Sequence, residues 1–82
     1  MPCDRPALPR DEALRQAHLY LDQMADDIDF GKSGPVLAKE ELDPKTKVWS
    51  FEFRAGDCVV LIGTDDCNGT DVSGLNAACK SK

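Results

Sequence analysis

The sequence contains a single histidine, His18, and none of its four cysteines belongs to a Cys-x-x-Cys pair. A structural zinc site takes four Cys or His ligands, usually in closely spaced pairs, so these residues argue against zinc. Basic residues are also scarce, because 10 Lys and Arg stand against 15 Asp and Glu and leave a net charge of −5. Nucleic-acid affinity comes largely from basic side chains that meet phosphates, so we expect no nucleic-acid partner. No apolar run approaches the roughly 18 residues that predict a membrane-spanning helix.

The cysteines are present in an even number, which permits two disulfides in three connectivities. They are Cys3, Cys58, Cys67 and Cys79. A Cys3–Cys79 bridge would tie the two ends of the chain together, and a Cys58–Cys67 bridge would close a short loop. The alternative is four free thiols in a cytosolic protein. A chain of 82 residues has a thin core that disulfides would help to stabilise. We therefore favour a periplasmic or secreted protein over a cytoplasmic one.

The first part of the chain predicts an extended lead-in and one helix. Residues 1–9 hold three prolines and should be extended. Residues 10–28 then carry an apolar stripe at alternating steps of three and four, which predicts an amphipathic helix. Pro9 suits the helix start, and Asp11 and Glu12 place negative charge where the helix dipole favours it. The stripe consists of Leu14, Ala17, Leu21, Met24 and Ile28.

The rest of the chain predicts an antiparallel β-meander followed by a polar loop and tail. Three segments read as strands because they are apolar or alternate with period two, and turn residues separate them. Together with the helix they predict one α+β domain, an N-terminal helix packed on a three- to four-stranded antiparallel sheet. The segments are 36–42, 47–54 and 58–62 within a meander over 36–62, with a polar loop and tail over 63–82 that contains a candidate edge strand at 70–73.

The last two predicted strands form a hairpin whose faces can be assigned before its register is known. A two-residue loop at 55–56 or at 56–57 changes the pairing partners but leaves the same residues on each face. A three-residue loop would reverse the faces. With a two-residue loop, Val59 and Leu61 lie on the outer face with Ser50 and Glu52. The face that receives the helix carries Trp49, Phe51, Phe53, Cys58, Val60 and Ile62.

His18 is the first residue to weigh for chemistry. It lies at the border of the helical stripe, four residues before Asp22. A nucleophile pair with Cys58 would need an oxyanion site or a third orienting group, and the sequence offers neither. We expect a partly buried histidine paired with Asp22, no catalytic residue and no cofactor. The protein is therefore predicted not to be an enzyme.

Residues 65–71 are the second place to weigh, because they look like a calcium loop. Asp65, Asp66, Asn68 and Asp71 are the candidate ligands. With Gly69 at the sixth position of such a loop, however, Thr64 and Leu75 occupy the first and twelfth positions, where acidic ligands are expected. We interpret the segment as a turn rich in Asx residues. A small metal- or ligand-binding domain that uses this loop stays as the alternative function.

Two features are typical of a protein-binding surface. Aspartates gather at the C-terminal end of the predicted helix, where the dipole disfavours each well-placed negative charge by about 0.3–1 kcal/mol. Such a cluster suits a partner with a basic surface. Apolar residues also lie outside the predicted core, and the outer sheet face could serve an oligomer as well as another protein. The predicted partner-binding residues are Asp22, Asp26, Asp27, Asp29, Leu19, Val59 and Leu61.

The order of elements resembles PepSY-type domains. The residues that carry the resemblance are the helix start at 11–14 with Ala17, the strand at 48–53, and the Gly56 turn into residues 59–62. The resemblance ends after Ile62, where a short Asp-x-x-Thr-Gly turn is usual and this chain has a longer loop with a cysteine. PepSY-type domains act as inhibitory or regulatory modules, and small immunity proteins have similar designs. The resemblance thus implies a non-enzymatic protein-binding module, an inhibitor, immunity-type or regulatory protein.

Overall fold

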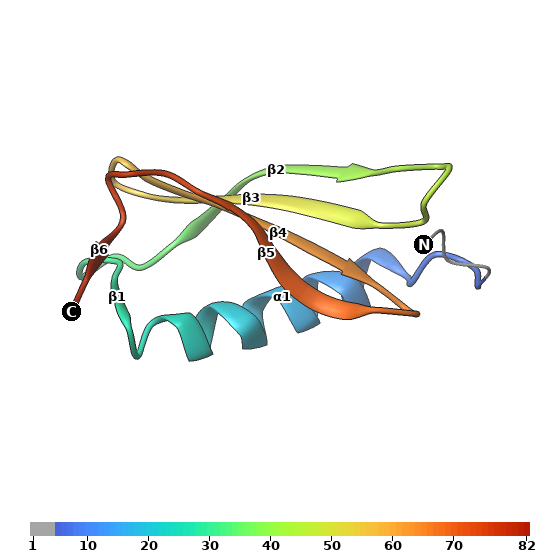
Figure 1. The fold of residues 1–82 in the computed structure, drawn as a ribbon, viewed down its shortest axis with the longest axis horizontal. Helices are drawn as coiled ribbons and strands as arrows, with labels where there is room; N and C mark the ends of the chain where they lie inside the picture. The colour runs from blue at the N-terminus through green and yellow to red at the C-terminus, as the bar shows by residue number, and fades with distance from the viewer. Residues whose placement is uncertain (1–4) are drawn as a thin grey trace.

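A computed structural model describes residues 5–82, which form one helix and six strands. Strands β2 to β5 make an antiparallel sheet in sequential order, and β1 pairs with β6 in a second, two-stranded sheet. Helix α1 lies across one face of the four-stranded sheet (Figure 1), which confirms the predicted α+β class. The elements are α1 Arg10–Met24, β1 Ile28–Asp29, β2 Val36–Leu42, β3 Trp49–Ala55, β4 Cys58–Asp65, β5 Gly69–Leu75 and β6 Lys80–Ser81.

Helix α1 begins where the sequence predicted but ends four residues early. Pro9 is its N-cap, and the carbonyl of Pro9 accepts the first helical hydrogen bond from Ala13 N at 3.0 Å. After Met24 the backbone tightens, because Asp27 N donates to Met24 O, three residues back, at 3.0 Å. The expected helix over 10–28 is thus wrong at its end. No basic residue in the last turn offsets the helix dipole there, and Ile28 leaves the helix to pair with Ser81.

The first hairpin joins β2 and β3 through a turn organised by Asp43. The Asp43 carboxylate accepts hydrogen bonds from the backbone N–H groups of Lys45 at 2.8 Å and Thr46 at 3.3 Å. These bonds hold the pKa of Asp43 below its ordinary value. Residue 47 stays in the turn, since Lys47 N donates to Asp43 O at 2.9 Å. Strand β3 therefore starts two residues later than predicted, whereas β2 has the predicted bounds.

The second hairpin joins β3 and β4 through the two-residue loop at 56–57. Ala55 pairs with Cys58 and Phe53 with Val60, so the 56–57 loop is the one that forms. Gly56 has a φ of 62°, which a residue without a Cβ adopts readily. Because the loop has two residues, both faces carry the residues that the alternation predicted.

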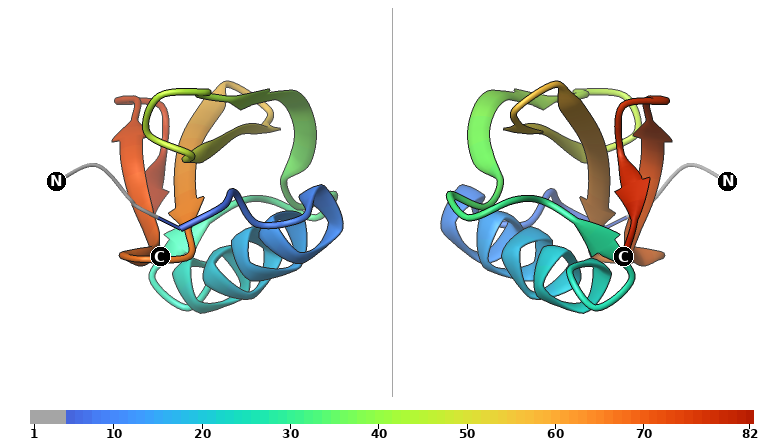
Figure 2. Two further views of the ribbon diagram at one scale, coloured as in Figure 1. Left: turned by 90° about the vertical axis from the view of Figure 1, so that its right-hand side faces the viewer. Right: turned by 90° about the vertical axis from the view of Figure 1, so that its left-hand side faces the viewer.

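The core lies between α1 and the inner face of the sheet. On the sheet side Phe51, Phe53 and Ile62 are each 0% exposed and Val60 is 1% exposed. Figure 2 shows the helix packed on this side of the sheet, with β2 and β5 at the two sheet edges. Trp49 also faces inward but is only partly buried; its indole Nε1 donates to Leu8 O at 2.7 Å and fixes the lead-in to the sheet. The residues that complete the core are Ala13, Ala17, Leu21, Phe30 and Cys58.

The tail is ordered by contacts with elements far away in the sequence. Strand β5 is longer than the candidate edge strand at 70–73. Beyond it, Asn76 accepts a hydrogen bond from Val59 N at 3.0 Å and donates to Asp57 O at 2.9 Å. Strand β6 then pairs with β1, which brings the C-terminus beside the end of the helix (Figure 1).

The disulfide of the tail corrects the predicted pairings. Cys79 is bonded to Cys58, with their Cα atoms 4.5 Å apart, so neither Cys3–Cys79 nor Cys58–Cys67 forms. Cys3 itself lies outside the described residues. Cys58 begins β4, and Cys67 comes after the end of β4, so the two stand roughly 20 Å or more apart at about 3.3 Å per residue. No cysteine among residues 5–82 is free.

Candidate functional site

The residues weighed for catalysis are engaged in structural contacts. The His18 side chain is exposed and its ring meets the Phe53 ring edge-on, with centroids 5.3 Å apart. The expected partly buried histidine paired with Asp22 is therefore wrong, because His18 covers the core instead. The sulfur of Cys58 is committed to the Cys79 disulfide, and a thiolate is the form a cysteine nucleophile needs. Among residues 5–82, the structure thus brings no cysteine nucleophile to His18.

The Asp65 carboxylate closes its own turn. Its Oδ1 accepts hydrogen bonds from Asn68 N and, at 3.0 Å, from Cys67 N. Its Oδ2 accepts one from Asn68 Nδ2 at 3.1 Å. Burial alone would raise the pKa of Asp65, but these bonds outweigh it and hold that pKa below its ordinary value. The predicted Asx-rich turn forms at residues 66–68, whereas residues 69–71 of the segment belong to β5.

The other candidate metal ligands point to separate partners. Asp66 pairs with Arg5 at 3.6 Å, and Asp71 accepts hydrogen bonds from Val72 N at 2.8 Å and from the Tyr20 hydroxyl at 3.5 Å. Within residues 5–82, no group of three or more His, Cys, Asp or Glu side chains is arranged to hold a metal ion. Asp65, Asn68 and Asp71 line one hollow, but the four candidate ligands do not converge on one point.

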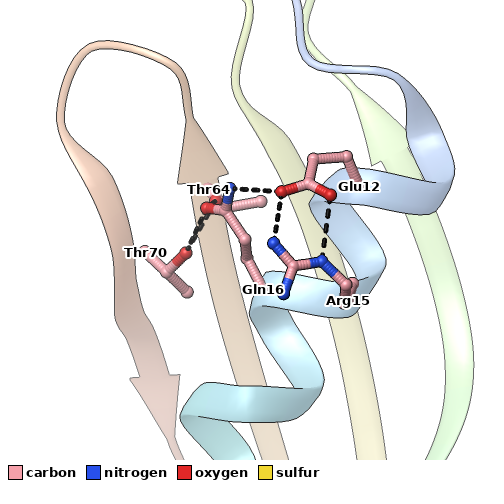
Figure 3. Close-up of polar contacts among 5 residues, drawn as sticks. All are labelled: Glu12, Arg15, Gln16, Thr64 and Thr70. Atoms are coloured by element: carbon pink, nitrogen blue, oxygen red, sulfur yellow. Dashed lines mark hydrogen bonds and ion pairs between the residues drawn. The ribbon is translucent and has the colours of Figure 1, made fainter.

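Sequence reasoning missed a polar cluster between the helix and the sheet, drawn in Figure 3. The Gln16 carbonyl oxygen lies 3.2 Å from the hydroxyl of Thr64 and 3.2 Å from that of Thr70, and the two hydroxyl oxygens are 2.7 Å apart. Two hydroxyl hydrogens serve three contacts, so one contact lacks a hydrogen at any moment. Thr64 is 1% exposed, which makes this the most deeply buried polar group of the sheet.

The cluster continues to the helix surface through Glu12. Gln16 Nε2 donates to Glu12 at 3.2 Å, and the Arg15 guanidinium donates to the same carboxylate at 2.6 and 3.0 Å. The hydrogen bonds from Arg15 and Gln16 lower the pKa of Glu12 to about 2. Gln16 lies outside the helical stripe, so the periodicity of the sequence carried no signal for this cluster. The buried polar groups of the cluster all have hydrogen-bond partners, so the cluster joins the helix to the sheet.

The predicted acidic cluster forms part of one exposed surface. Leu19, Asp22 and Asp26 follow at steps of three and four along α1 and its C-cap turn, so they lie on one side of the helix. Leu19 is 50% exposed, and Asp22, Asp26 and Asp27 are exposed as well. The ion pairs among residues 5–82 involve Arg5, Arg10, Arg15 and Arg54, and none of them includes these three aspartates. We name Leu19, Asp22, Asp26 and Asp27 the acidic helix face.

Asp29 departs from this group. It lies in β1, where it stands opposite Lys80 of β6, and its carboxylate accepts a hydrogen bond from Gly31 N at 2.9 Å. Opposite charges on facing residues of paired strands attract each other. The tail therefore supplies Asp29 with a basic neighbour that the sequence alone did not assign to it.

Val59 and Leu61 lie on the other side of the sheet, on a surface we name the outer sheet face. It consists of the residues of β2, β3 and β4 that alternate with the core residues. Val36 and Leu61 are 62% and 38% exposed there, and no helix or strand of the described chain lies over this face (Figure 1). A hollow of about 350 Å³ opens on it. Apart from Asp29, the predicted partner-binding residues thus divide between two surfaces on opposite sides of the sheet. The face comprises Val36, Lys39, Glu41, Ser50, Glu52, Arg54, Val59, Leu61 and Gly63.

Comparisons with known proteins add no relative. No family model, no curated protein and no solved structure matches this chain, so the resemblance to PepSY-type domains stays a prediction.

Proposed function

We propose that the protein is a non-enzymatic module that binds another protein, of the inhibitor, immunity or regulatory class, through the acidic helix face. One observation carries the proposal. An exposed leucine, Leu19, shares one side of the helix with Asp22 and Asp26, and these carboxylates have no ion-pair partner within residues 5–82. The partner that fits is a protein with an apolar pocket rimmed by Lys or Arg.

The acidic helix face lowers the stability of the unbound protein. Asp22 and Asp26 are like charges four residues apart, and both stand near the helix end that the dipole makes negative. Lys or Arg side chains of a partner would relieve both costs on binding. A face that is unfavourable in the free protein and favourable in a complex is what a binding role predicts.

The helix that presents this face is fixed to the sheet at two places. Arg10, in its first turn, forms an ion pair with Glu40 of β2, and the Gln16 cluster holds its middle to β4 and β5. A preorganised surface loses less entropy on binding, which favours affinity. The Cys58–Cys79 disulfide is compatible with a secreted or periplasmic protein, and we place the binding event in such an oxidising compartment.

The test is quantitative affinity capture from extracts of the source organism, with wild type and two variants as baits. In the first variant Asp22, Asp26 and Asp27 become Asn; the matched control changes two carboxylates of the outer sheet face, Glu41→Gln with Glu52→Gln. We expect the captured protein to be lost with the first variant and kept with the control. The affinity of the purified complex should fall as salt rises. Equal affinity and equal salt dependence for wild type and the Asn variant would disprove the proposal.

A further inference from the structure

We propose that the outer sheet face binds the same face of a second copy of this chain, in a two-fold symmetric dimer. This inference does not rest on the acidic helix face, which lies on the opposite side of the sheet and stays open in such a dimer. It rests on the order in which charged, polar and apolar residues repeat across the strands.

The outer sheet face is open for association, whereas both edges of the sheet are irregular and resist pairing with a further strand. The pairing of β2 with β3 shifts register between Leu37 and Lys39, and that of β5 with β4 shifts opposite Leu61 and Ile62. Bulges of this kind at both edge strands, β2 and β5, disfavour the addition of a further strand. A second copy therefore has better access to the face than to an edge.

Two neighbouring rows of residues run across the face, because directly paired residues of adjacent strands share a side. The hollow on the face lies along these rows, since Lys39, Glu41, Ser50, Glu52 and Leu61 all line it. From β2 to β4, the first row is Lys39, Glu52 and Leu61, and the second row is Glu41, Ser50 and Gly63.

The two rows are complementary to each other. A two-fold axis that crosses the strands midway between the rows lays each row on the other row of the second copy. Lys39 then meets Glu41 of the second copy, and Glu52 meets a serine hydroxyl. Leu61 then lies over Gly63 and beside the apolar side chain of Val48, whose Cγ1 stands 3.5 Å from the position of a Cβ on Gly63. The strands of the two sheets run nearly aligned, as in common sheet-on-sheet packing.

The charge of the face also favours a second copy over a charged partner. Strands β2 and β3 contribute the cations Lys39 and Arg54 and the anions Glu41 and Glu52 to the face, so this part of the face is neutral although the whole chain carries −5. Arg54 and Glu52 already pair within one copy at 3.1 Å. Two copies repel each other through the rest of their acidic surface, and the neutral part of the face on β2 and β3 lets them approach without net repulsion there.

Sedimentation equilibrium of the full chain tests the proposal, from about 1 µM to about 1 mM, where weak dimers dissociate. We expect a reversible dimer of the wild type. Lys39→Glu and Glu41→Lys should each weaken it about tenfold or more, because each change places like charges opposite one another. An equimolar mixture of these two variants should dimerise again, since the acidic pair of one copy then faces the basic pair of the other.

Two further variants separate this register from other contacts. Leu61→Arg should abolish the dimer, whereas Leu19→Arg on the acidic helix face should leave it unchanged. Circular dichroism of each variant checks that it is folded. A wild type that stays monomeric at about 1 mM would overturn the proposal. A mixture no tighter than its separate components, or a dimer lost with Leu19→Arg and kept with Leu61→Arg, would overturn it as well.

Discussion

The two faces of the four-stranded sheet have opposite relations to the rest of the chain. On the inner face Phe51, Phe53 and Ile62 are fully buried beneath α1. On the outer face Val36 and Leu61 are 62% and 38% exposed, and charged residues separate them. Both faces belong to the same strands, so backbone pairing cannot account for the difference.

The difference shows which side the chain uses for its own stability. The inner face is apolar apart from Glu40, which pairs with Arg10, and the satisfied cluster around Thr64. The outer face mixes charged with apolar residues in neighbouring rows. Burial of apolar area is the main source of folding free energy, so the inner face stabilises the fold. The outer face is then available for association.

The largest expected effect tests this contrast directly. Phe51→Ala should destabilise the protein by about 3–5 kcal/mol, because it leaves a cavity in a closed core. Leu61→Ala, one strand away on the other face, should cost about 1 kcal/mol or less, as exposed positions usually do. Urea denaturation at low protein concentration measures both. Equal losses would show that the outer face contributes to the fold of the single chain.

The disulfide lies at one end of the inner face, and its removal should cause the second largest loss of stability. Cys58 and Cys79 are 21 residues apart, and a loop of this size predicts about 3 kcal/mol of stabilisation. The double variant Cys58→Ala with Cys79→Ala should lose that amount in urea denaturation. Amide hydrogen exchange should also become faster in β6 and in its partner β1. Unchanged exchange there would mean that the Asn76 hydrogen bonds hold the tail without the disulfide.

The third prediction concerns the two hydroxyl groups of the polar cluster on the inner face. Thr64→Val and Thr70→Val should each cost about 1 kcal/mol, because the remaining hydroxyl can still donate to the Gln16 carbonyl. The double variant should cost more than the sum of the two, since Gln16 then loses every hydroxyl donor. Additive losses would contradict the shared-donor arrangement.

The smallest expected effect is the pH dependence contributed by Glu12. Its pKa in the folded protein is about 2, below the ordinary 4.5. A lowered folded-state pKa adds stability above pH 4.5 that is lost as the pH falls towards 2. The Glu12→Gln variant should therefore lose less stability than the wild type over this range. Because the pair with Arg15 is exposed, we expect a modest difference in thermal unfolding. Identical pH profiles would show that the pair is open in solution.

Regular patterns were predicted well because they depend on neighbours in the sequence. The helical stripe from Leu14 to Met24 and the bounds of β2 required only local periodicity. The prediction failed for Ile28, which fits the stripe but pairs with Ser81, a residue at the other end of the chain. It failed for His18 too, because the ring that it contacts belongs to Phe53 in another element.

The candidate surfaces were predicted in part. The exposure of Leu19 and the outward side of Leu61 followed from periodicity, and the structure places both as expected. The rows across the outer face could not be predicted, because they require the register of β2 on β3. The turn at Asp43 sets that register. Its hydrogen bonds keep Lys47 in the turn, so that β3 begins only at Trp49.

The sequence by itself determined which side chains share a face of the sheet. Alternation with period two gives the same answer for either two-residue loop, so the faces did not depend on knowing the turn. Only the tertiary structure decided where the tail lies, which cysteine bonds to Cys58, and which carboxylates have no ion-pair partner within residues 5–82. These outcomes depend on Asn76, Cys79 and Lys80 returning to β4 and β1, and contacts over such separations leave no periodic pattern in the sequence.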